Sequence, residues 1–343
     1  MDEMKNKKKG GGVLFLIIII VVALLTLAFG LLRGFGVIKF NPSLPSRKER
    51  SNPVNVGNFK FGNFGSRGKY VARLYITGVI QEANETYNQK WLLDTIDYLE
   101  NDEDNVGILL VIDSPGGTVY EADETYLALR KYKNAGKDVW AYFKSMAASG
   151  AYYISCAADT VYANRNTMTG SIGVIIGPTF DATVLLDKLG LKATSFVSGK
   201  NKGMLNYDNP LTDEQRKIMQ GLVDECYDQF TSIVAAARKK SLSETKDLAD
   251  GRIYTAKQAK ENGLIDSIGS LENAEDRMRE RIAISQDLST EEADAVDFRD
   301  YEYIYQAPFM RRVFESTTGV SLKRVVDEKL GPSIKYPAYL FQY

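Results

Sequence analysis

One serine in this chain stands where a nucleophile needs to be, at the junction of an expected strand and an expected helix. Residues 138–143 are apolar, small residues fill the turn that follows, and Ser149 and Gly150 begin the helix. A serine in such a turn exposes its hydroxyl at the positive end of the helix dipole, and the next N–H has no intrahelical partner. Ser149 can therefore attack a carbonyl while Gly150 donates to the oxyanion. The same pattern is also typical of a small-residue helix start packed on a sheet, and taken alone it favours that second interpretation.

A pair of glycines marks a second place where a strand meets a helix. Gly116 and Gly117 follow the continuous apolar run of residues 106–112, which is typical of a strand covered on both faces. Paired glycines let a backbone approach a ligand closely, and a helix start presents free N–H groups. With the Ser149 turn, they are expected to supply two N–H donors for one oxyanion. A tight strand-to-helix turn with only a structural role is compatible with the same residues.

The absence of histidine limits which bases are available. None of the 343 residues is a histidine, which excludes a Ser-His-Asp triad, a Cys-His pair and a His-ligated zinc site. A nucleophilic serine must then use a lysine or a carboxylate as its base. The two cysteines, Cys156 and Cys226, are too few for a disulfide framework or a Cys-rich metal site, and we expect each to fill a gap in the core. The net charge of −1 leaves no electrostatic footprint for nucleic acid.

Two lysines lie in a loop-like stretch, residues 196–204, between glycines. Lys200 and Lys202 are the candidates for a base in this stretch. A lysine accepts a proton only when its neutral form is populated, which requires desolvation in a closed apolar site. The residues alone favour a solvated structural role for both lysines.

The elements expected around these residues alternate between strand and helix. Strand, helix, strand, helix in this order implies an α/β architecture with right-handed crossovers. Further along, Thr212 and Gln215 have the spacing of a capping box before an amphipathic helix. The expected strands cover residues 70–78, 106–112, 138–143 and 160–163, and the expected helices cover residues 91–99, about 120–134 and the segment after Ser149.

An uncharged apolar segment near the N-terminus predicts a membrane anchor. Residues 13–32 carry no charge, and about 20 helical residues span the roughly 30 Å of a bilayer core. A cleaved signal peptide is the rival interpretation, and charges on both sides of the span give opposing orientation signals. We expect residues 1–12 to form a cytoplasmic tail, 33–69 a linker, 70–283 the catalytic domain outside the membrane, and 284–343 a C-terminal extension.

The last part of the sequence is acidic and then aromatic. Residues 291–297 are expected to be solvated, and residues 336–343 are apolar and aromatic. Such a segment usually docks on its own domain or on a neighbour. A position in a substrate groove is the less favoured alternative.

Five motifs follow one another along the chain, and together they are specific although none is so alone. They resemble the motifs of the signal peptide peptidase A family, serine peptidases of the ClpP/crotonase-like fold. The resemblance covers roughly residues 70–280. The motifs lie at residues 114–117, 146–155, 169–174, 198–202 and 250–256.

This resemblance implies a role for each matching residue. Ser149 is implied as the nucleophile of a Ser-Lys dyad and Lys202 as its general base. Gly117 and Gly150 match the oxyanion positions, and Ser171 matches a serine that orients the lysine.

Two of these assignments have an alternative, and three positions depart from the family pattern. Gly116 is the alternative to the first oxyanion position, and Lys200 is the rival base. Ala151 and Thr118 stand where glycines are usual, and Gly203 stands where an acidic residue is frequent. The departures concern the shape of the groove and the surroundings of the lysine.

The resemblance further implies a fold and a function. The fold is α/β, with the repeated β-β-α superhelix of ClpP and crotonase, preceded by one transmembrane helix. The function is a membrane-anchored serine endopeptidase in the bacterial cell membrane, which hydrolyses remnant signal peptides without a metal or cofactor. Its partners are apolar peptides and copies of itself, in a homo-oligomer with active sites at the subunit interfaces. The alternatives are a same-fold peptidase acting on membrane proteins and a non-catalytic scaffold, and an acyl-CoA enzyme is least favoured.

Overall fold

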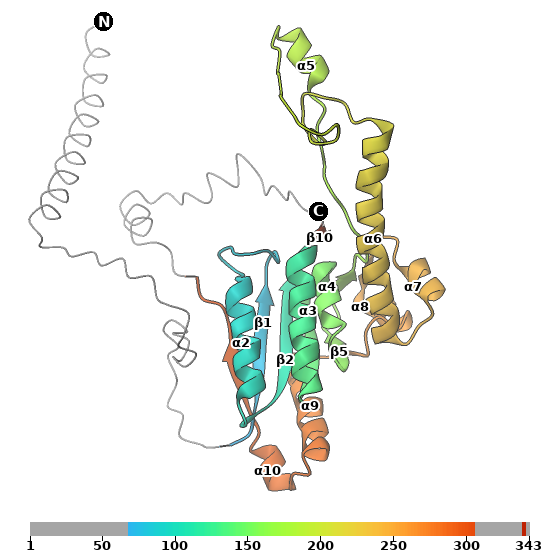
Figure 1. Ribbon diagram of the computed structural model, residues 1–343. Coiled ribbons are helices and arrows are strands. Elements are labelled where there is room, and N and C mark those ends of the chain that lie inside the picture. The colour runs from blue at the N-terminus through green and yellow to red at the C-terminus, as the bar shows by residue number, and fades with distance from the viewer. Residues whose placement is uncertain (1–67, 306–337, 341–343) are drawn as a thin grey trace, which may run out of the picture. The chain divides into compact units, whose positions relative to one another are not determined.

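Parallel strands from the middle of the chain form the sheet on which the candidate site is built (Figure 1). A computed structural model describes residues 68–305 and 338–340. The expected anchor over residues 13–32, the tail before it and nearly all of the linker lie outside the described residues. None of the helices that are described is long and apolar enough to cross a membrane.

Strands and helices alternate through the first half of the described chain, as the apolar patterns predict. The strands are β1 (Tyr70–Thr77), β2 (Asn105–Ser114), β3 (Gly116–Thr118), β4 (Asp138–Ala148), β5 (Thr160–Ala163), β6 (Met168–Gly170), β7 (Ile253–Thr255), β8 (Ser267–Ile268), β9 (Asp297–Tyr301) and β10 (Ala338–Leu340). The helices are α2 (Gln89–Asn101), α3 (Val119–Asn134), α4 (Gly150–Ser155), α5 (Thr183–Lys188), α6 (Asp213–Arg238), α7 (Leu242–Leu248), α8 (Ala256–Glu261), α9 (Leu271–Ser285) and α10 (Thr290–Asp294).

The main sheet has the strand order β7-β6-β4-β2-β1-β9, and β5 and β8 join it beside β4. All of its strand pairs are parallel except β6–β7. The expected α/β architecture with a parallel sheet is therefore confirmed. Strand β4 pairs with β5 along Trp140–Phe143 and with β6 along Met146–Ala148. Strand β4 thus changes its pairing partner from β5 to β6 shortly before Ser149.

Alternation along β1 shows how the two faces of the sheet are buried. Ala72, Leu74 and Ile76 belong to the larger apolar cluster, which includes residues of α2, α3 and α4. Val71 belongs to a second cluster with residues of α9. Successive strand residues point to opposite faces, so one strand supplies both cores. Burial on both faces explains why β2 reads as a continuous apolar run rather than an alternating one.

Helix α6 is a long rod of which only one end is buried. Thr212 and Gln215 form the predicted capping box at its start. Its buried residues, Phe230, Thr231, Val234 and Ala235, all lie in the C-terminal third. The N-terminal part carries the connection from α5 (Figure 1).

Part of the expected C-terminal extension belongs to the sheet. Helix α9 continues past residue 283, and α10 follows with no buried residue. Strand β9 then pairs in parallel with β1, so residues 297–301 form one edge of the sheet. Of residues 291–297, which the acidic composition predicts to be solvated, Val296 is buried in the second apolar cluster, and the others are exposed or partly exposed.

Candidate active site

Ser149 lies at a strained turn between β4 and α4. Its φ is 56° and its ψ is −119°, a combination that costs a non-glycine residue energy and is typical of a nucleophile on a sharp strand-to-helix turn. The side chain is 1% exposed, and its Oγ has no hydrogen-bond partner among the described residues. A buried hydroxyl normally has a hydrogen-bond partner, so the unbonded Ser149 Oγ marks this turn as a candidate functional site.

Strand β6 holds the turn in place. The Ser149 N–H donates to the Gly170 carbonyl oxygen at 2.8 Å, and Ser171 follows with a φ of 49°. The N–H of Ser171 donates to the Arg252 carbonyl oxygen at 2.8 Å, which ties this turn to β7. Ser171, the residue expected to orient the lysine, therefore directly follows Gly170, which is hydrogen-bonded to Ser149.

Strand β3 lies next to this turn because β2 and β4 are paired up to their ends. Ser114 is in register with Ala147, and β3 packs against α4. The N–H of Gly116 donates to the Ser114 Oγ at 3.1 Å. A Cβ at Gly117 would lie 1.7 Å from the Ile80 carbonyl oxygen, so only glycine fits there. The structure therefore brings both glycine turns to one end of the sheet.

One edge of β3 forms main-chain hydrogen bonds with Ile80, and the other edge pairs with a strand from a distant part of the sequence. The Ile80 N–H donates to the Gly116 carbonyl oxygen and the Thr118 N–H donates to the Ile80 carbonyl oxygen, both at 2.9 Å. In a strand the next residue points its polar groups the other way, so the N–H and C=O of Gly117 face the opposite edge. Strand β10 pairs antiparallel along that edge, with Tyr339 opposite Gly117.

Lys202 lies on an exposed loop beside the start of α6. Its own N–H donates to the Gly199 carbonyl oxygen at 3.0 Å, which closes a turn. The rival base, Lys200, forms an ion pair with Glu214 at 2.7 Å, and Asn201 binds the same carboxylate. Hydrogen bonds from Lys200 and Asn201 hold the pKa of the Glu214 carboxyl below its ordinary value. The lysine loop is thereby attached to the first turn of α6.

The length of α6 separates this loop from Ser149. Near the other end of the helix, Gln229 donates to the Tyr153 hydroxyl at 2.7 Å, and the Phe230 ring lies 5.1 Å from the Tyr153 ring. Tyr153 is in α4, one turn after Ser149. Fifteen residues from Glu214 to Gln229 correspond to about 22 Å of helix. A single chain therefore does not bring Ser149 and Lys202 together.

Known proteases resemble this chain over much of its length. The model of peptidase family S49 matches residues 131–285. A Synechocystis protein provisionally named protease slr0021 is 39% identical over 210 residues, which cover 61% of this chain and 73% of that protein. The chain belongs to peptidase family S49. This membership confirms the predicted family and supports a serine protease as the class of enzyme.

The chain is also similar to a second protease and to a solved structure. An Enterococcus faecium protein provisionally named signal peptide peptidase SppA is 37% identical over 222 residues, or 63% of this chain. The match spans 64% of that relative, less than two thirds of its length. Among solved structures, a ClpP1 mutant from Listeria monocytogenes aligns with a TM-score of 0.41 and 16% identity, over 59% of this chain and 92% of that one.

One residue near the site of this S49 member was not predicted to have a role. The Tyr153 hydroxyl donates to the Asp123 Oδ1 at 2.5 Å and accepts from Gln229, so it joins α4 to α3 and α6. Tyr153 lies inside the motif over residues 146–155. Apolar periodicity marks such a tyrosine as core, and no sequence signal indicates which distant polar groups meet it.

The cysteine directly after α4, Cys156, is not a rival nucleophile. Cys156 is 7% exposed, and burial raises the pKa of its thiol to about 12. Only the thiolate attacks, so little of Cys156 is reactive near neutral pH. We expect iodoacetamide near pH 8 to modify the partly exposed Cys226 first and to leave peptidase activity unchanged, as measured by mass spectrometry and peptide cleavage. Loss of activity in step with alkylation of Cys156 would contradict this.

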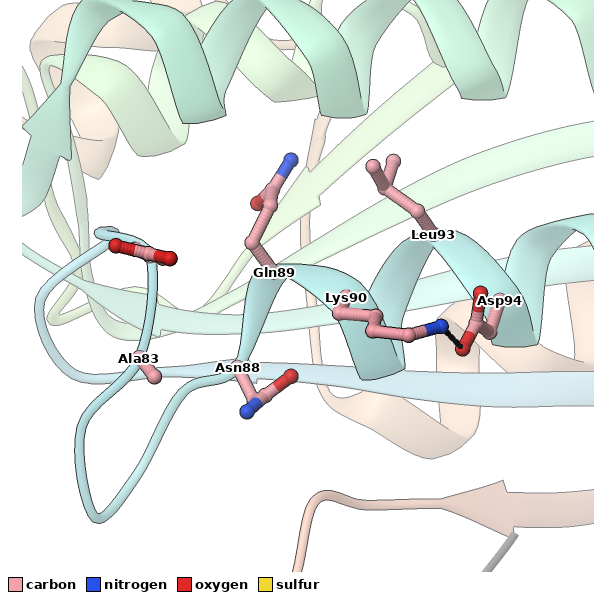
Figure 2. Close-up of a pocket in the computed structure, with 7 residues that line it drawn as sticks. Ala83, Asn88, Gln89, Lys90, Leu93 and Asp94 are labelled. Carbon is pink, nitrogen blue, oxygen red and sulfur yellow. Dashed lines mark hydrogen bonds and ion pairs between the residues drawn. The ribbon is translucent and has the colours of Figure 1, made fainter. Parts of the chain in front are cut away.

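A surface hollow at the start of α2 is separate from the residues described above. Its volume is about 350 Å³, and it is lined by Glu82, Ala83, Asn88, Gln89, Lys90, Leu93 and Asp94. Figure 2 shows Lys90 paired with Asp94, at 2.6 Å. Asn88 accepts a hydrogen bond from the Trp91 N–H, and Gln89 bonds to Thr125. These side chains cap and brace α2, and none of the predicted catalytic residues lines the hollow.

Proposed function

We propose that this chain is a membrane-anchored serine endopeptidase that uses Ser149 and Lys202 to hydrolyse remnant signal peptides. The single observation that carries the proposal is Ser149 itself, a strained and buried serine with an unbonded Oγ at a strand-to-helix turn. Membership of family S49 supports the class of reaction. The anchor over residues 13–32 remains a prediction from the sequence.

The chemistry follows the logic of other serine nucleophiles. The Ser149 hydroxyl attacks the peptide carbonyl while its proton passes to the neutral amine of Lys202. The carbonyl oxygen becomes an oxyanion, and the N–H groups of Gly117 and Gly150 stabilise it. The tetrahedral intermediate collapses, the lysine returns the proton to the leaving amine, and an acyl-enzyme on Ser149 remains. Water then attacks the acyl carbonyl while the same lysine takes its proton; the bond between the acyl group and Ser149 Oγ breaks, the lysine returns the proton to Oγ, and the acyl group leaves as a carboxylic acid.

The base comes from a second copy of the chain. In one copy, α6 holds the Lys202 loop about 22 Å from the contacts that α6 makes with α4. Several large apolar side chains are exposed around α5. Large exposed apolar patches often mark protein–protein interfaces. The exposed apolar residues around α5 include Phe180, Val184, Leu185, Leu189, Leu191 and Phe196, of which Phe196 is 97% exposed. We therefore propose a homo-oligomer in which each Lys202 serves the Ser149 of a neighbour.

The substrate is an extended apolar peptide. The edge of β3 that faces away from Ile80 can hold an added strand by main-chain hydrogen bonds, as peptide-binding sheet edges do. That edge pairs with β10, from the apolar segment at residues 336–343. Remnant signal peptides have this apolar chemistry and lie at the membrane to which the anchor would hold the enzyme.

Labelling with a fluorophosphonate probe tests the proposed nucleophile. The probe should form a covalent adduct with the wild-type chain at Ser149, located by peptide mass spectrometry. Ser149→Ala should remove the adduct, and Lys202→Ala should slow its formation because no base takes the proton. Ser145→Ala is the matched control, because Ser145 is an exposed serine four residues away that bonds Asp113. An adduct that persists in Ser149→Ala would refute the assignment.

A further inference from the structure

Helix α6 holds Lys202 away from the core at the end of an arm. The arm, residues 183–211, contains α5 and the lysine loop, and it joins the rest of the chain through α6 and through residues 176–182 (Figure 1). Residues 176–182 form neither a helix nor a strand, so α6 is the rigid connection in this part of the described structure. Counted from the arm, the first buried residue of α6 is Phe230. The helix before Phe230 therefore projects from the core together with the arm.

Small changes in the angle of α6 move Lys202 by distances that matter for proton transfer. Glu214, which binds the lysine loop, is separated from Gln229 by about 22 Å of helix. At this length a rotation of about 3° moves the loop by about 1 Å, and a misplacement of 1 Å can cost about 10²-fold in rate. The angle at which α6 leaves the domain must therefore be held closely if Lys202 is to reach the Ser149 of a neighbour.

The Tyr153 side chain lies where this angle is decided. Its ring is 5.5 Å from the Tyr126 ring in α3 and 5.1 Å from the Phe230 ring in α6. Its hydroxyl donates to the Asp123 Oδ1 at 2.5 Å and accepts from the Gln229 Nε2 at 2.7 Å. An ionised carboxylate only accepts, so the hydroxyl hydrogen goes to Asp123 and an oxygen lone pair is left for Gln229. Ring packing holds the helices together, and the two directional bonds fix their orientation.

We propose that the Tyr153 hydroxyl is a positioning group for the catalytic lysine. Through Gln229 it sets the angle of α6, and with it the place that Lys202 of the same chain takes at the Ser149 of a neighbour. This inference rests on the proposed function, because it takes each lysine to serve another copy. The alternative is local support of the nucleophile, since the Tyr153 N–H donates to the Ser149 carbonyl oxygen at 2.9 Å. The two roles differ in which copy of the chain they affect.

Mixed oligomers separate the two roles, because one copy supplies the serine and the other supplies the lysine. A Ser149→Ala copy supplies only Lys202, and a Lys202→Ala copy supplies only Ser149. Tyr153→Phe is introduced into one copy at a time, differently tagged copies are co-expressed and purified over both tags, and cleavage of an apolar peptide is measured. In the Ser149→Ala copy, Tyr153→Phe should lower kcat at least about tenfold, because the arm of that copy is misplaced. In the Lys202→Ala copy it should change kcat little.

The Tyr153→Phe variant is expected to fold and assemble. It keeps the ring contacts, and the groups that lose a partner can bind water, since Asp123 is partly exposed and Gln229 is exposed. Thermal unfolding and size-exclusion chromatography check this. Tyr126→Phe is the matched control, because the Tyr126 hydroxyl accepts from Arg130 within α3. In the Ser149→Ala copy it should leave kcat at the value of the parent mixture, and a tenfold loss there would overturn the assignment to the Tyr153 hydroxyl.

Gln229→Leu tests the link from the hydroxyl to α6. It removes the Nε2 donor and leaves the bond between Tyr153 and Asp123. In the Ser149→Ala copy, Gln229→Leu should reproduce most of the loss caused by Tyr153→Phe. The double variant should lose no more than Tyr153→Phe alone, because both substitutions remove the same bond. Losses that multiply would contradict a path through Gln229.

The parent mixture, without any change at Tyr153, separates this inference from the proposed function. If the parent mixture is active and Tyr153→Phe lowers kcat equally in both copies, or more in the Lys202→Ala copy, the positioning role is overturned and the shared dyad stands. If the parent mixture is inactive, the shared dyad is contradicted, and the positioning role fails with it.

Discussion

Two inactive variants, Ser149→Ala and Lys202→Ala, are expected to restore peptidase activity when they assemble into one oligomer. Each variant alone should lose at least about 10³-fold in kcat, since removal of a nucleophile or its base leaves only oxyanion stabilisation and binding. In a mixed oligomer, the intact Ser149 of one copy meets the intact Lys202 of another. With equal amounts and random placement around a ring, about a quarter of the sites should be complete.

The experiment needs co-expression, because subunits of a stable oligomer do not exchange freely. Two differently tagged copies are expressed together and purified over both tags, and cleavage of an apolar peptide is measured. The matched control pairs Ser149→Ala with a copy that carries both substitutions. In this mixture no intact Ser149 exists, and it should stay inactive. If the mixture of Ser149→Ala and Lys202→Ala stays inactive, a dyad shared between two copies is contradicted.

The strands and helices before Ser149 are predictable because each depends on local periodicity. The apolar runs that begin near Tyr70 and Val106 and the helical spacing after Trp91 correspond to β1, β2 and α2. The capping box at Thr212 is local for the same reason. Where neighbouring residues decide the structure, the sequence is sufficient.

Pairing between distant segments is not available from such patterns. Strand β4 continues to Ala148 because β6 pairs with its end, and the apolar run alone indicates a stop near Phe143. Strands β3, β9 and β10 contain five residues or fewer, too few to show a period. Only their partners in the sheet define them as strands.

The candidate site divides in the same way. Ser149 and Gly150 are predictable because one turn contains both. The separation of Lys202 from that turn depends on the length of α6 and on its contact with Tyr153, which joins three helices. The motifs indicate which residues are the candidate catalytic residues. Whether one chain can bring these residues together depends on the rigid elements between them, here α6.

Gly117→Ala should lower kcat/KM by about 10²-fold or more, the typical effect of losing one oxyanion donor, or roughly 3 kcal/mol of transition-state stabilisation. The new Cβ would lie 1.7 Å from the Ile80 carbonyl oxygen, so β3 must move away from Ile80. Gly117 is not among the residues with positive φ, and the contact rather than the backbone torsion is the cause. The displaced strand carries away both the oxyanion donor and the edge that binds the peptide, so kcat should fall and KM should rise. Steady-state kinetics on an apolar peptide measures both.

A matched glycine elsewhere separates this effect from a general response to a methyl group. Gly221 lies in the exposed part of α6, and a Cβ there would meet nothing within 4 Å. Gly221→Ala should leave kcat/KM unchanged and stabilise the helix by about 0.5–1 kcal/mol, because alanine loses less conformational freedom on folding. Overpacking at Gly117 costs about 1–3 kcal/mol of stability, so the melting temperature of Gly117→Ala should fall while the chain remains folded at assay temperature. A folded Gly117→Ala chain with undiminished kcat/KM would show that the oxyanion is stabilised elsewhere, and Gly116 would then be the donor to test.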